Sequence, residues 1–391
     1  MSTSINTNKV LGSTSGTSII AGNVLLPPVN TVAPVISGTN NIGQVLTTTD
    51  GTWTGTPAPT FAYQWFRGAA AISGQTATTY TIQSQDLHPT AQAITCQVTA
   101  TNASGTAVAT SNIITPVILP FVFTIDTNNI SAGSSTSTQF KLPLNNSTGL
   151  NIVVDWGDAS TSTITSHLAA AVTHSYAIAG TYTISITGTL QSFMFQNAGD
   201  RLKILEVQSW GILHIALNTS NQIFHTCTNL TCIATDAPKI THTNLNFMFY
   251  NCVNFNGAIG NWDVSVVKFF TFTFCNTTVF NQPLNNWDTS SALGMSNMFR
   301  TTTATPTGFN QDIGSWDVSN VTNFFNFMRG KSAATFSTAN LDAIYNGWSA
   351  SGVKPNLTIT FGSARYTAAG QPGKDILDFA PNNWTITDGG I

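Results

Sequence analysis

One phrase occurs three times between residues 255 and 320, and it constrains the fold more than any other feature of this chain. It begins with Phe-Asn and ends with Trp-Asp-Val/Thr-Ser, at 255–265, 280–290 and 309–319. The Trp follows the Phe by 7 residues in each copy, and successive Trp residues are 25 and 29 residues apart. A period of roughly 20–30 residues is typical of repeat proteins whose units bury their apolar faces on one another. The region is therefore expected to be a stack of repeats.

Apolar spacing inside each copy predicts its local structure. The first copy reads Ile259-x-x-Trp262-x-Val264, an alternation typical of a short strand. After it, apolar residues recur at offsets of 3 and 7, which places them on one face of a helix. The three sets are Val267, Phe270, Phe274; Ala292, Met295, Phe299; and Val321, Phe324, Met328. Each repeat is therefore predicted to be a short strand, a turn and a short helix.

The repeat phrase resembles the leucine-rich-like repeat of bacterial surface proteins of the BspA type. The likeness covers roughly residues 202–391, because the tail, with Trp348, Phe361 and Trp384, is similar to the segment that often closes such repeats. The resemblance implies an α/β leucine-rich-like solenoid over 199–335 with a C-terminal cap over 336–391. It also implies a surface-exposed, binding-type role without chemistry.

Two further segments resemble β-sandwich modules. Residues 31–117 contain Tyr63-Gln-Trp65 and Ile94-Thr-Cys96, which resemble bacterial and phage immunoglobulin-like domains with Trp65 buried and Cys96 on a neighbouring strand. Leu46 is expected on the partner strand, so no inter-sheet disulfide is expected. Residues 1–30, rich in Ser, Thr, Gly and Asn, are expected to be an N-terminal arm and a candidate anchor.

Residues 118–198 resemble the polycystic-kidney-disease (PKD) domain. The likeness rests on Asp155-Trp-Gly-Asp158 and on His174-Ser-Tyr176 followed by Gly-Thr-Tyr182. Asp155 and Asp158 offer oxygen ligands of the kind that calcium prefers. Two carboxylates at a turn more often bond to nearby backbone N–H groups, and that interpretation is favoured here. The whole chain is thus predicted to be multidomain and mainly β.

Composition narrows the functional classes. Charged residues make up 7% of the 391, against about 25% in an average protein, and the 13 Lys and Arg are scattered. A nucleic-acid surface needs clustered cations, so nucleic acid is not an expected partner. No segment approaches the roughly 20 apolar residues of a membrane span, and the N-terminus does not read as a signal peptide.

The five cysteines are predicted to be buried free thiols, with Cys227 and Cys252 in stacked core positions. His225 and His242 flank Cys227 and Cys232 at a spacing that matches no zinc module. No nucleophile elbow, phosphate loop or metalloprotease motif is present, and no pair of acids stands out as a glycosidase pair. The chain is therefore expected to be non-enzymatic, with no cofactor and no metal.

The repeat places one Asp per copy at an outward position after the Trp: Asp263, Asp288 and Asp317. Three stacked carboxylates about 4.8 Å apart would repel one another unless each is solvated or bonded locally. The favoured interpretation is that each Asp caps its local turn together with its Ser or Asn neighbours. The alternative is a ligand-facing stripe at these three positions.

Surface-type modules without an export signal suggest a structural or adhesion protein on the exterior of a phage virion, made in the host cytoplasm. It would be a capsid decoration, head-fibre or tail-fibre protein, docked by its N-terminal part and multimeric in the assembly. Its expected partners are other virion proteins and a host surface glycan or protein. The alternative is a bacterial cell-surface adhesin exported by an unrecognised route. An enzyme acting on surface polysaccharide would require an acidic pair converging in one cleft.

Overall fold

A computed structural model describes residues 25–41, 44–86, 91–117, 119–145, 149–216, 222–302 and 308–391. Most of its regular elements are β-strands, and the described residues contain two α-helices, α1 (Thr338–Ser349) and α2 (Gln371–Asp378). The chain is therefore mainly β, as expected. Neither helix has the length and apolarity that a membrane crossing requires. Most of the arm expected at 1–30 lies outside the described residues, but its end, from Leu26, belongs to the first strand.

Internal contacts divide the chain into two compact units. The first comprises the chain up to Ser37, Thr47–Thr78 and Thr95–Ile113. The second comprises Gly38–Leu46, Thr79–Ile94 and Ile114–Ile391. The module expected at 31–117 is thus shared between the units, since two of its internal segments group with the second.

The N-terminal strands form three small sheets with the orders β1-β4, β2-β3-β7 and β6-β5-β8-β9. Trp65 and Cys96, on β5 and β8, have no exposed surface, which confirms their prediction as core residues. The Trp65 indole Nε1 donates to the Ala77 carbonyl at 2.9 Å, so its polar edge is satisfied inside the core. The elements are β1 (Leu26–Val32), β2 (Ile36–Ser37), β3 (Val45–Thr48), β4 (Thr52–Thr56), β5 (Thr60–Arg67), β6 (Ala70–Ala71), β7 (Thr79–Thr81), the 3₁₀ helix η1 (Ser84–Asp86), β8 (Ile94–Asn102) and β9 (Gly105–Thr110).

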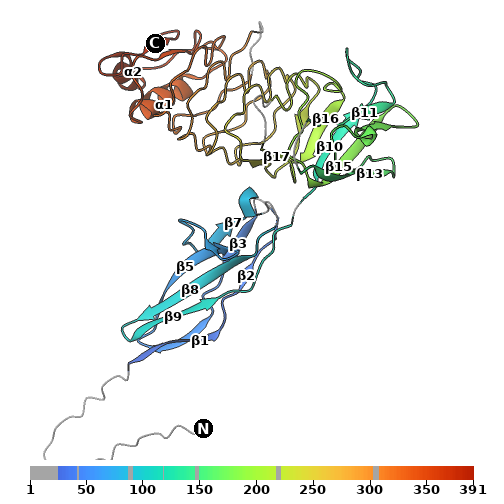
Figure 1. Cartoon of the computed structure of the whole chain (residues 1–391). Helices are drawn as coiled ribbons and strands as arrows, with labels where there is room; N and C mark the ends of the chain where they lie inside the picture. Colours follow the sequence, from blue (N-terminus) through green and yellow to red (C-terminus); the bar gives the residue numbers. More distant parts are fainter. Residues whose placement is uncertain are drawn as a thin grey trace, which may run out of the picture. The chain divides into compact units, whose positions relative to one another are not determined.

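A six-stranded sheet in the order β13-β12-β15-β10-β16-β18 crosses the boundary expected at 198/199 (Figure 1). β10 pairs antiparallel with both β15 and β16, and β16 pairs parallel with β18. The segment read as PKD-like and the start of the repeat region therefore share one sheet. Its strands, the smaller ones beside it and a 3₁₀ helix are β10 (Phe121–Asp126), β11 (Gln139–Lys141), β12 (Asn151–Asp155), β13 (Thr161–Ile164), η2 (Ala170–Val172), β14 (Thr173–Ser175), β15 (Thr181–Thr189), β16 (Ile204–Ser209), β17 (His214–Ile215), β18 (Thr231–Cys232) and β19 (Lys239–Ile240).

A fully buried ion pair lies just before β16. The Lys203 Nζ is 3.5 Å from a carboxylate oxygen of Asp200, and neither side chain is exposed. The same amine donates to the Thr136 and Gln139 carbonyls at 2.8 and 2.7 Å. Asp200 in turn accepts from the Ser135 backbone N–H at 2.7 Å. The pair fastens the 135–139 loop to the strand that begins the repeat region.

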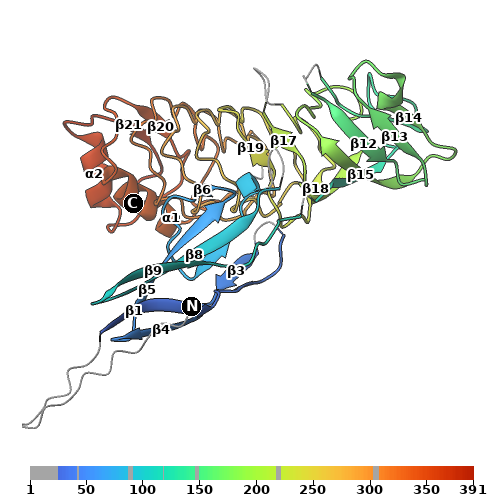
Figure 2. The ribbon, with the colours of Figure 1, turned by 60° about the horizontal axis from the view of Figure 1, so that its bottom comes forward.

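The repeat region contains coils without the predicted helices. Figure 1 shows a run of stacked turns between β10 and β16 at one end and α1 and α2 at the other, and Figure 2 shows it from another side. Isolated parallel bridges join one residue per coil, from Asn244 to Phe269, Gly294 and Asn323. The segment 259–264, predicted to be a strand, instead forms a turn closed by the Trp262 N–H on the Ile259 carbonyl at 3.1 Å.

Backbone hydrogen bonds explain why the helix prediction is wrong. The N–H groups of Phe270, Phe272, Phe274 and Asn276 donate to carbonyls of the next coil, 24 residues on, at 2.8–3.0 Å. Phe272 and Asn276 have φ values of 58° and 57°, in the left-handed region, which a right-handed helix excludes. The apolar offsets of 3 and 7 mark the side chains that face the core of a coil, and the backbone N–H groups given above donate to the neighbouring coil and not within their own coil as in a helix.

Equivalent side chains stack from coil to coil inside the region. Phe249, Phe274 and Phe299 have ring centroids 5.7 and 5.6 Å apart, with interplanar angles of 11° and 5°. The Trp287 and Trp316 rings lie 6.3 Å apart. Each of these two indoles donates through Nε1 to a carbonyl of the preceding coil, at 2.9 and 2.8 Å. The repeated Phe and Trp of the sequence are therefore the core of the stack.

The Asn that follows the repeated Phe forms a second ladder. The Asn281 backbone N–H donates to the Asn256 Oδ1 at 2.9 Å, and the Asn310 N–H donates to the Asn281 Oδ1 at 2.8 Å. The Ser337 N–H continues the series onto Asn310 at 2.8 Å. Each side-chain amide thus satisfies a backbone donor of the next coil that would otherwise lack an intramolecular acceptor.

The last coils pack against a C-terminal segment that contains both α-helices. Ser337 caps α1 by accepting the Asn340 N–H, and Leu341, Ile344 and Trp348 are buried on its inner face. β20 (Thr358–Thr360) and β21 (Thr385–Thr387) pair in parallel, and Phe324 bridges to Ile359. The Trp348 Nε1 extends the indole series by donating to the Ile313 carbonyl at 3.0 Å.

Candidate functional site

The three Asp positions of the repeat lie in turns. The Ser265 and Ser290 backbone N–H groups donate to Asp263 and Asp288 at 3.1 and 3.0 Å, and the same two Ser hydroxyls donate at 2.6 Å. The Ser319 N–H donates to Asp317 at 2.9 Å. Asp288 and Asp317 are exposed and Asp263 is half-buried. The turn role favoured from the sequence is thus observed, and one oxygen of each carboxylate is engaged locally.

Asp155 and Asp158 also form turns. The Asp155 Oδ1 accepts the Gly157 N–H at 3.0 Å, and the Asp158 Oδ1 accepts the Ser160 N–H at the same distance. The second oxygen of Asp158 pairs with the His174 Nε2 at 2.8 Å. The His174 ring lies parallel to the Trp156 ring, with centroids 4.7 Å apart. The residues around Asp155, Asp158 and His174 are therefore held together by hydrogen bonds within the turn and by stacking of His174 on Trp156.

The cysteine side chains are free thiols in the core, as predicted, except that Cys232 is half-buried. Burial raises the pKa of Cys275 to about 11 and that of Cys232 to about 12, so both are protonated at neutral pH. Among the described residues, no three His, Cys, Asp or Glu side chains converge closely enough to hold a metal ion.

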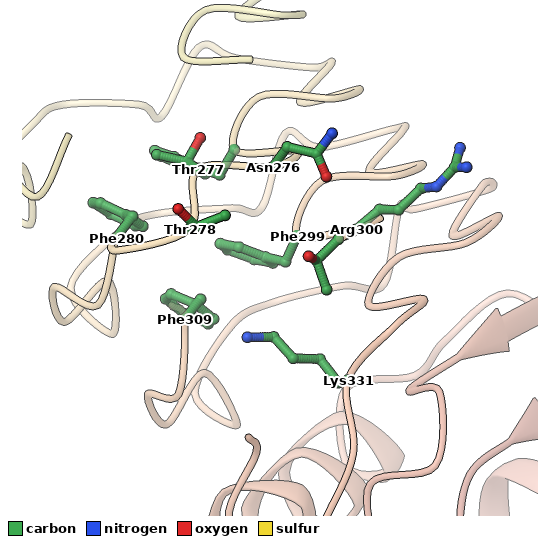
Figure 3. Close-up of a pocket in the computed structure, with 10 residues that line it drawn as sticks. Asn276, Thr277, Thr278, Phe280, Phe299, Arg300, Phe309 and Lys331 are labelled. Atoms are coloured by element: carbon green, nitrogen blue, oxygen red, sulfur yellow. The ribbon is translucent and has the colours of Figure 1, made fainter. Parts of the chain in front are cut away.

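A small hollow lies over the Phe stack between the coils that contain Asn276 and Lys331 (Figure 3). Its volume is about 10 Å³, the space of one water molecule, so it does not hold an organic ligand. Figure 3 shows the Lys331 amine directed toward Phe309, while the Arg300 guanidinium extends away from the rings. Lys331 is 3% exposed, and this burial lowers the pKa of its amine to about 8.

A larger cavity of about 230 Å³ lies between the 133–145 and 194–200 segments. It is smaller than the roughly 300–1,000 Å³ of sites that enclose drug-sized ligands. The Asp200 carboxylate borders it, and Lys203, Ser135 and Lys141 already engage that group. Among the described residues that line this cavity, Asp200 is the one acid, and its carboxylate is already bound by groups of the fold.

The outward side chains of the coils form the most distinctive surface. Within each coil the residues between the buried core positions face outward, and aromatic rings occupy many of these places. Phe269 and Phe325 are 39% and 59% exposed. We call this surface the aromatic face and define it by Phe247, Tyr250, Phe269, Phe272 and Phe325.

Two rings of the aromatic face occupy an unfavourable backbone conformation. Phe247 and Phe272 both have φ of 58°, where a bulky L-residue costs roughly 1–2 kcal/mol. The next two coils carry Asn297 and Asn326 there, and Asn tolerates this conformation well. The Phe247 and Phe272 rings stack with centroids 4.8 Å apart and an angle of 9°. Backbone strain of this kind is often found at functional positions, so these two rings merit a functional hypothesis.

The charge on the aromatic face has one sign. The five outward segments, 222–229, 243–251, 268–276, 293–301 and 322–330, contain no Asp or Glu. They carry Lys268 and Arg329, which are exposed, and Arg300, which is half-buried and donates to the Asn297 Oδ1 at 3.4 Å. Burial, together with the charge of Arg201, lowers the pKa of His225 beside Phe247, so this ring is neutral at neutral pH.

The aromatic face was not predicted from the sequence, because the candidate site residues in the sequence were acids and metal ligands. A usable signal was present in the repeat alignment. At the place of Phe269 the neighbouring coils have Asn244 and Gly294, and at the place of Phe325 the preceding coil has Ser296, so these two rings are not required for stacking. Large apolar residues at places where the repeat accepts small polar ones mark a surface with another role.

Comparison with known proteins gives one match. Residues 218–344, which include the aromatic face, match the family model described as Mycoplasma protein of unknown function, DUF285. No curated protein matches the chain. No solved structure matches it. The repeat coils and the start of the cap are therefore the part of this chain that is similar to a described protein family.

Proposed function

We propose that this chain is a non-enzymatic attachment protein whose repeat region binds a ligand on a host or partner surface through the aromatic face. The observation that carries the proposal is the exposure of Phe269 and Phe325 on coils whose stacking does not need them. The acidic side chains Asp158, Asp200 and Asp288 bond to turns or to a buried amine, which suits scaffolding more than proton transfer.

The modular architecture supports the same function. We interpret the N-terminal strands as an immunoglobulin-like sandwich, the strands before β16 as a PKD-like sandwich, and the coils as a leucine-rich-like solenoid with its cap. A chain of this kind separates a docking end from a binding end. Weak contacts by each copy would suffice if many copies are displayed, because multivalency raises the effective concentration.

We place this protein on the exterior of a phage virion, as a capsid decoration, head-fibre or tail-fibre protein. The second candidate is a bacterial cell-surface adhesin, and the family match favours it, because that family is described from a cellular organism. Mass spectrometry of purified particles and of the cell-envelope fraction from one lysate distinguishes them. Recovery with the major capsid protein supports the virion location. Recovery in the envelope alone would replace it with the adhesin.

A test of the attachment role itself uses the full-length chain. Fluorescently labelled protein is incubated with intact host cells, and the cell-bound fraction is measured. We expect saturable binding that unlabelled protein displaces. Binding that does not saturate, or that unlabelled protein fails to displace, would refute the attachment role whichever particle or cell carries the chain.

A further inference from the structure

We propose that the aromatic face binds an acidic polysaccharide, a chain of sugar rings that carries carboxylate or sulfate groups. This inference rests on the proposed attachment function and specifies the chemistry of its ligand. It follows from three properties of the face, namely which rings are exposed, which charges accompany them, and how both are spaced along the stack.

The exposed rings offer apolar surface at separate coils. Phe269 lies over Gly294 of the next coil, whose missing side chain leaves room for the ring, since a Cβ there would be 3.3 Å from the Phe269 Cδ1. Phe325 belongs to the coil after that and is the more exposed of the two. Adjacent β-type coils are spaced about 4.8 Å apart. The two rings are therefore roughly two coil spacings apart along the stack, and a ligand that meets both must be extended.

The charged groups select an anion. Lys268 is adjacent to Phe269 in the chain, and Arg329 belongs to the same coil as Phe325. No carboxylate in the outward segments competes for either cation. A neutral ligand would leave these features unused.

The spacing favours a polymer over a compact ligand. The coils repeat one outward pattern, with a ring or a small residue such as Asn, Gly, Ser or Thr at each place, and a ligand that repeats its own chemistry can match several coils at once. Sugar rings present apolar C–H groups to the phenyl rings and hydroxyls to the exposed Asn323 beside them. An exposed ion pair contributes only about 0–1 kcal/mol, so each copy should bind weakly and the binding should weaken in salt.

The test measures binding of the full-length protein to immobilised polygalacturonate, dextran sulfate and unmodified dextran, which are carboxylated, sulfated and neutral polymers. We expect binding to at least one acidic polymer, little binding to dextran, and at least about tenfold weaker binding when salt is raised from 0.1 to 1 M, where the screening length falls from about 10 to about 3 Å. The preferred acidic polymer identifies the anionic group.

Variants take their residues from neighbouring coils, so the stack is preserved. Phe269→Asn copies Asn244 and Asn323, Phe272→Asn copies Asn297, and Phe325→Ser copies Ser296. We expect this triple variant to bind at least about tenfold more weakly while its thermal unfolding remains close to that of the parent.

A second variant removes charge alone, by Lys268→Gln with Arg329→Gln. Its matched control, Lys354→Gln with Arg365→Gln, removes two exposed cations that lie outside the coils. We expect the first pair to weaken binding to the acidic polymer and the control pair to leave it unchanged.

Three results would overturn the proposal. These are equal binding to dextran and to the acidic polymers, an equal effect of the two charge variants, or no binding to any acidic polymer. In the last case, saturable binding to host cells would keep the attachment function and exclude only this ligand class. Loss of both would refute the proposed function as well.

Discussion

Trp262 and Trp287 provide a sharp test of how the coils are held together. They occupy the same place in adjacent repeats, and each is 3% exposed. The Trp287 Nε1 donates to the Ile259 carbonyl at 2.9 Å. The Trp262 Nε1 is buried and meets no acceptor among the described residues. Replacing each by Phe therefore removes nearly the same packing surface but has opposite consequences for hydrogen bonding.

The expected difference can be worked out from these contacts. Trp287→Phe removes one hydrogen bond, worth about 1 kcal/mol net. The Ile259 carbonyl keeps the Trp262 backbone N–H at 3.1 Å, so it is not left bare. Trp262→Phe removes a buried donor without a partner, whose burial costs about 1–3 kcal/mol. The packing losses largely cancel, so Trp287→Phe should destabilise the repeat region by about 2–4 kcal/mol more than Trp262→Phe.

The assay is urea unfolding of the full-length chain, followed by hydrogen exchange with mass spectrometry. Peptides from the coils report the repeat region separately, which matters because a multidomain chain need not unfold in one transition. Trp316→Phe is a replicate of the bonded case, since its Nε1 donates to the Leu284 carbonyl at 2.8 Å.

Equal destabilisation by the three variants would refute the reasoning, because the indole bonds would then contribute nothing measurable. A larger loss for Trp262→Phe than for Trp287→Phe would show that the Trp262 N–H has an acceptor in solution.

Three further outcomes are expected. Asp200→Asn should lower the free energy of unfolding by about 3–5 kcal/mol, because it leaves the buried Lys203 ammonium without its counter-charge, and a thermal melt that is unchanged would contradict this. The Lys331 pKa is about 8 when folded and about 10.4 when unfolded, so the unfolded chain binds more protons between these values. Stability should therefore rise by roughly 3 kcal/mol from pH 8 to pH 10.4, and urea titrations at pH 7 and 10.5 should show that Lys331→Met loses this rise. Asn281→Ala should lower the free energy of unfolding by about 1 kcal/mol and speed hydrogen exchange of the Asn310 backbone N–H, which donates to the Asn281 side chain. An unchanged exchange rate at Asn310 would show that the Asn ladder is not formed.

The sequence predicted the residues of the core better than their backbone. Phe274, Trp287 and Trp316 were identified by their period, and all are buried in stacked positions. The helix assigned around Phe274 was wrong, because offsets of 3 and 7 describe which side chains point inward and do not say where the N–H groups go. The left-handed Asn276 was a visible clue, since Asn recurs at such positions in the coils.

Contacts between segments that are distant in the chain could not be predicted from the sequence. Nothing in the local pattern around Lys203 indicates that its amine meets carbonyls near Gln139, more than 60 residues earlier in the chain. The pairing of β10 with β16 depends on the same kind of long-range closure. For the candidate site, one residue type was predicted correctly and another was not. Asp288 was correctly interpreted as a turn residue, while Phe325 was overlooked because a single exposed ring carries no motif.

The backbone ladder of the coils has a consequence for how such a chain can change in evolution. Donors and acceptors are 24 residues apart between the coils of Leu245 and Phe269, yet 28 apart between those of Met295 and Asn323, and the bonds are equally short at 2.9 Å. The number of residues between successive coils is therefore uncoupled from the stack. We expect insertions and deletions between coils to vary freely among related sequences, while whole coils are gained or lost by duplication. Binding surface can thus be lengthened in fixed increments without a new core having to evolve.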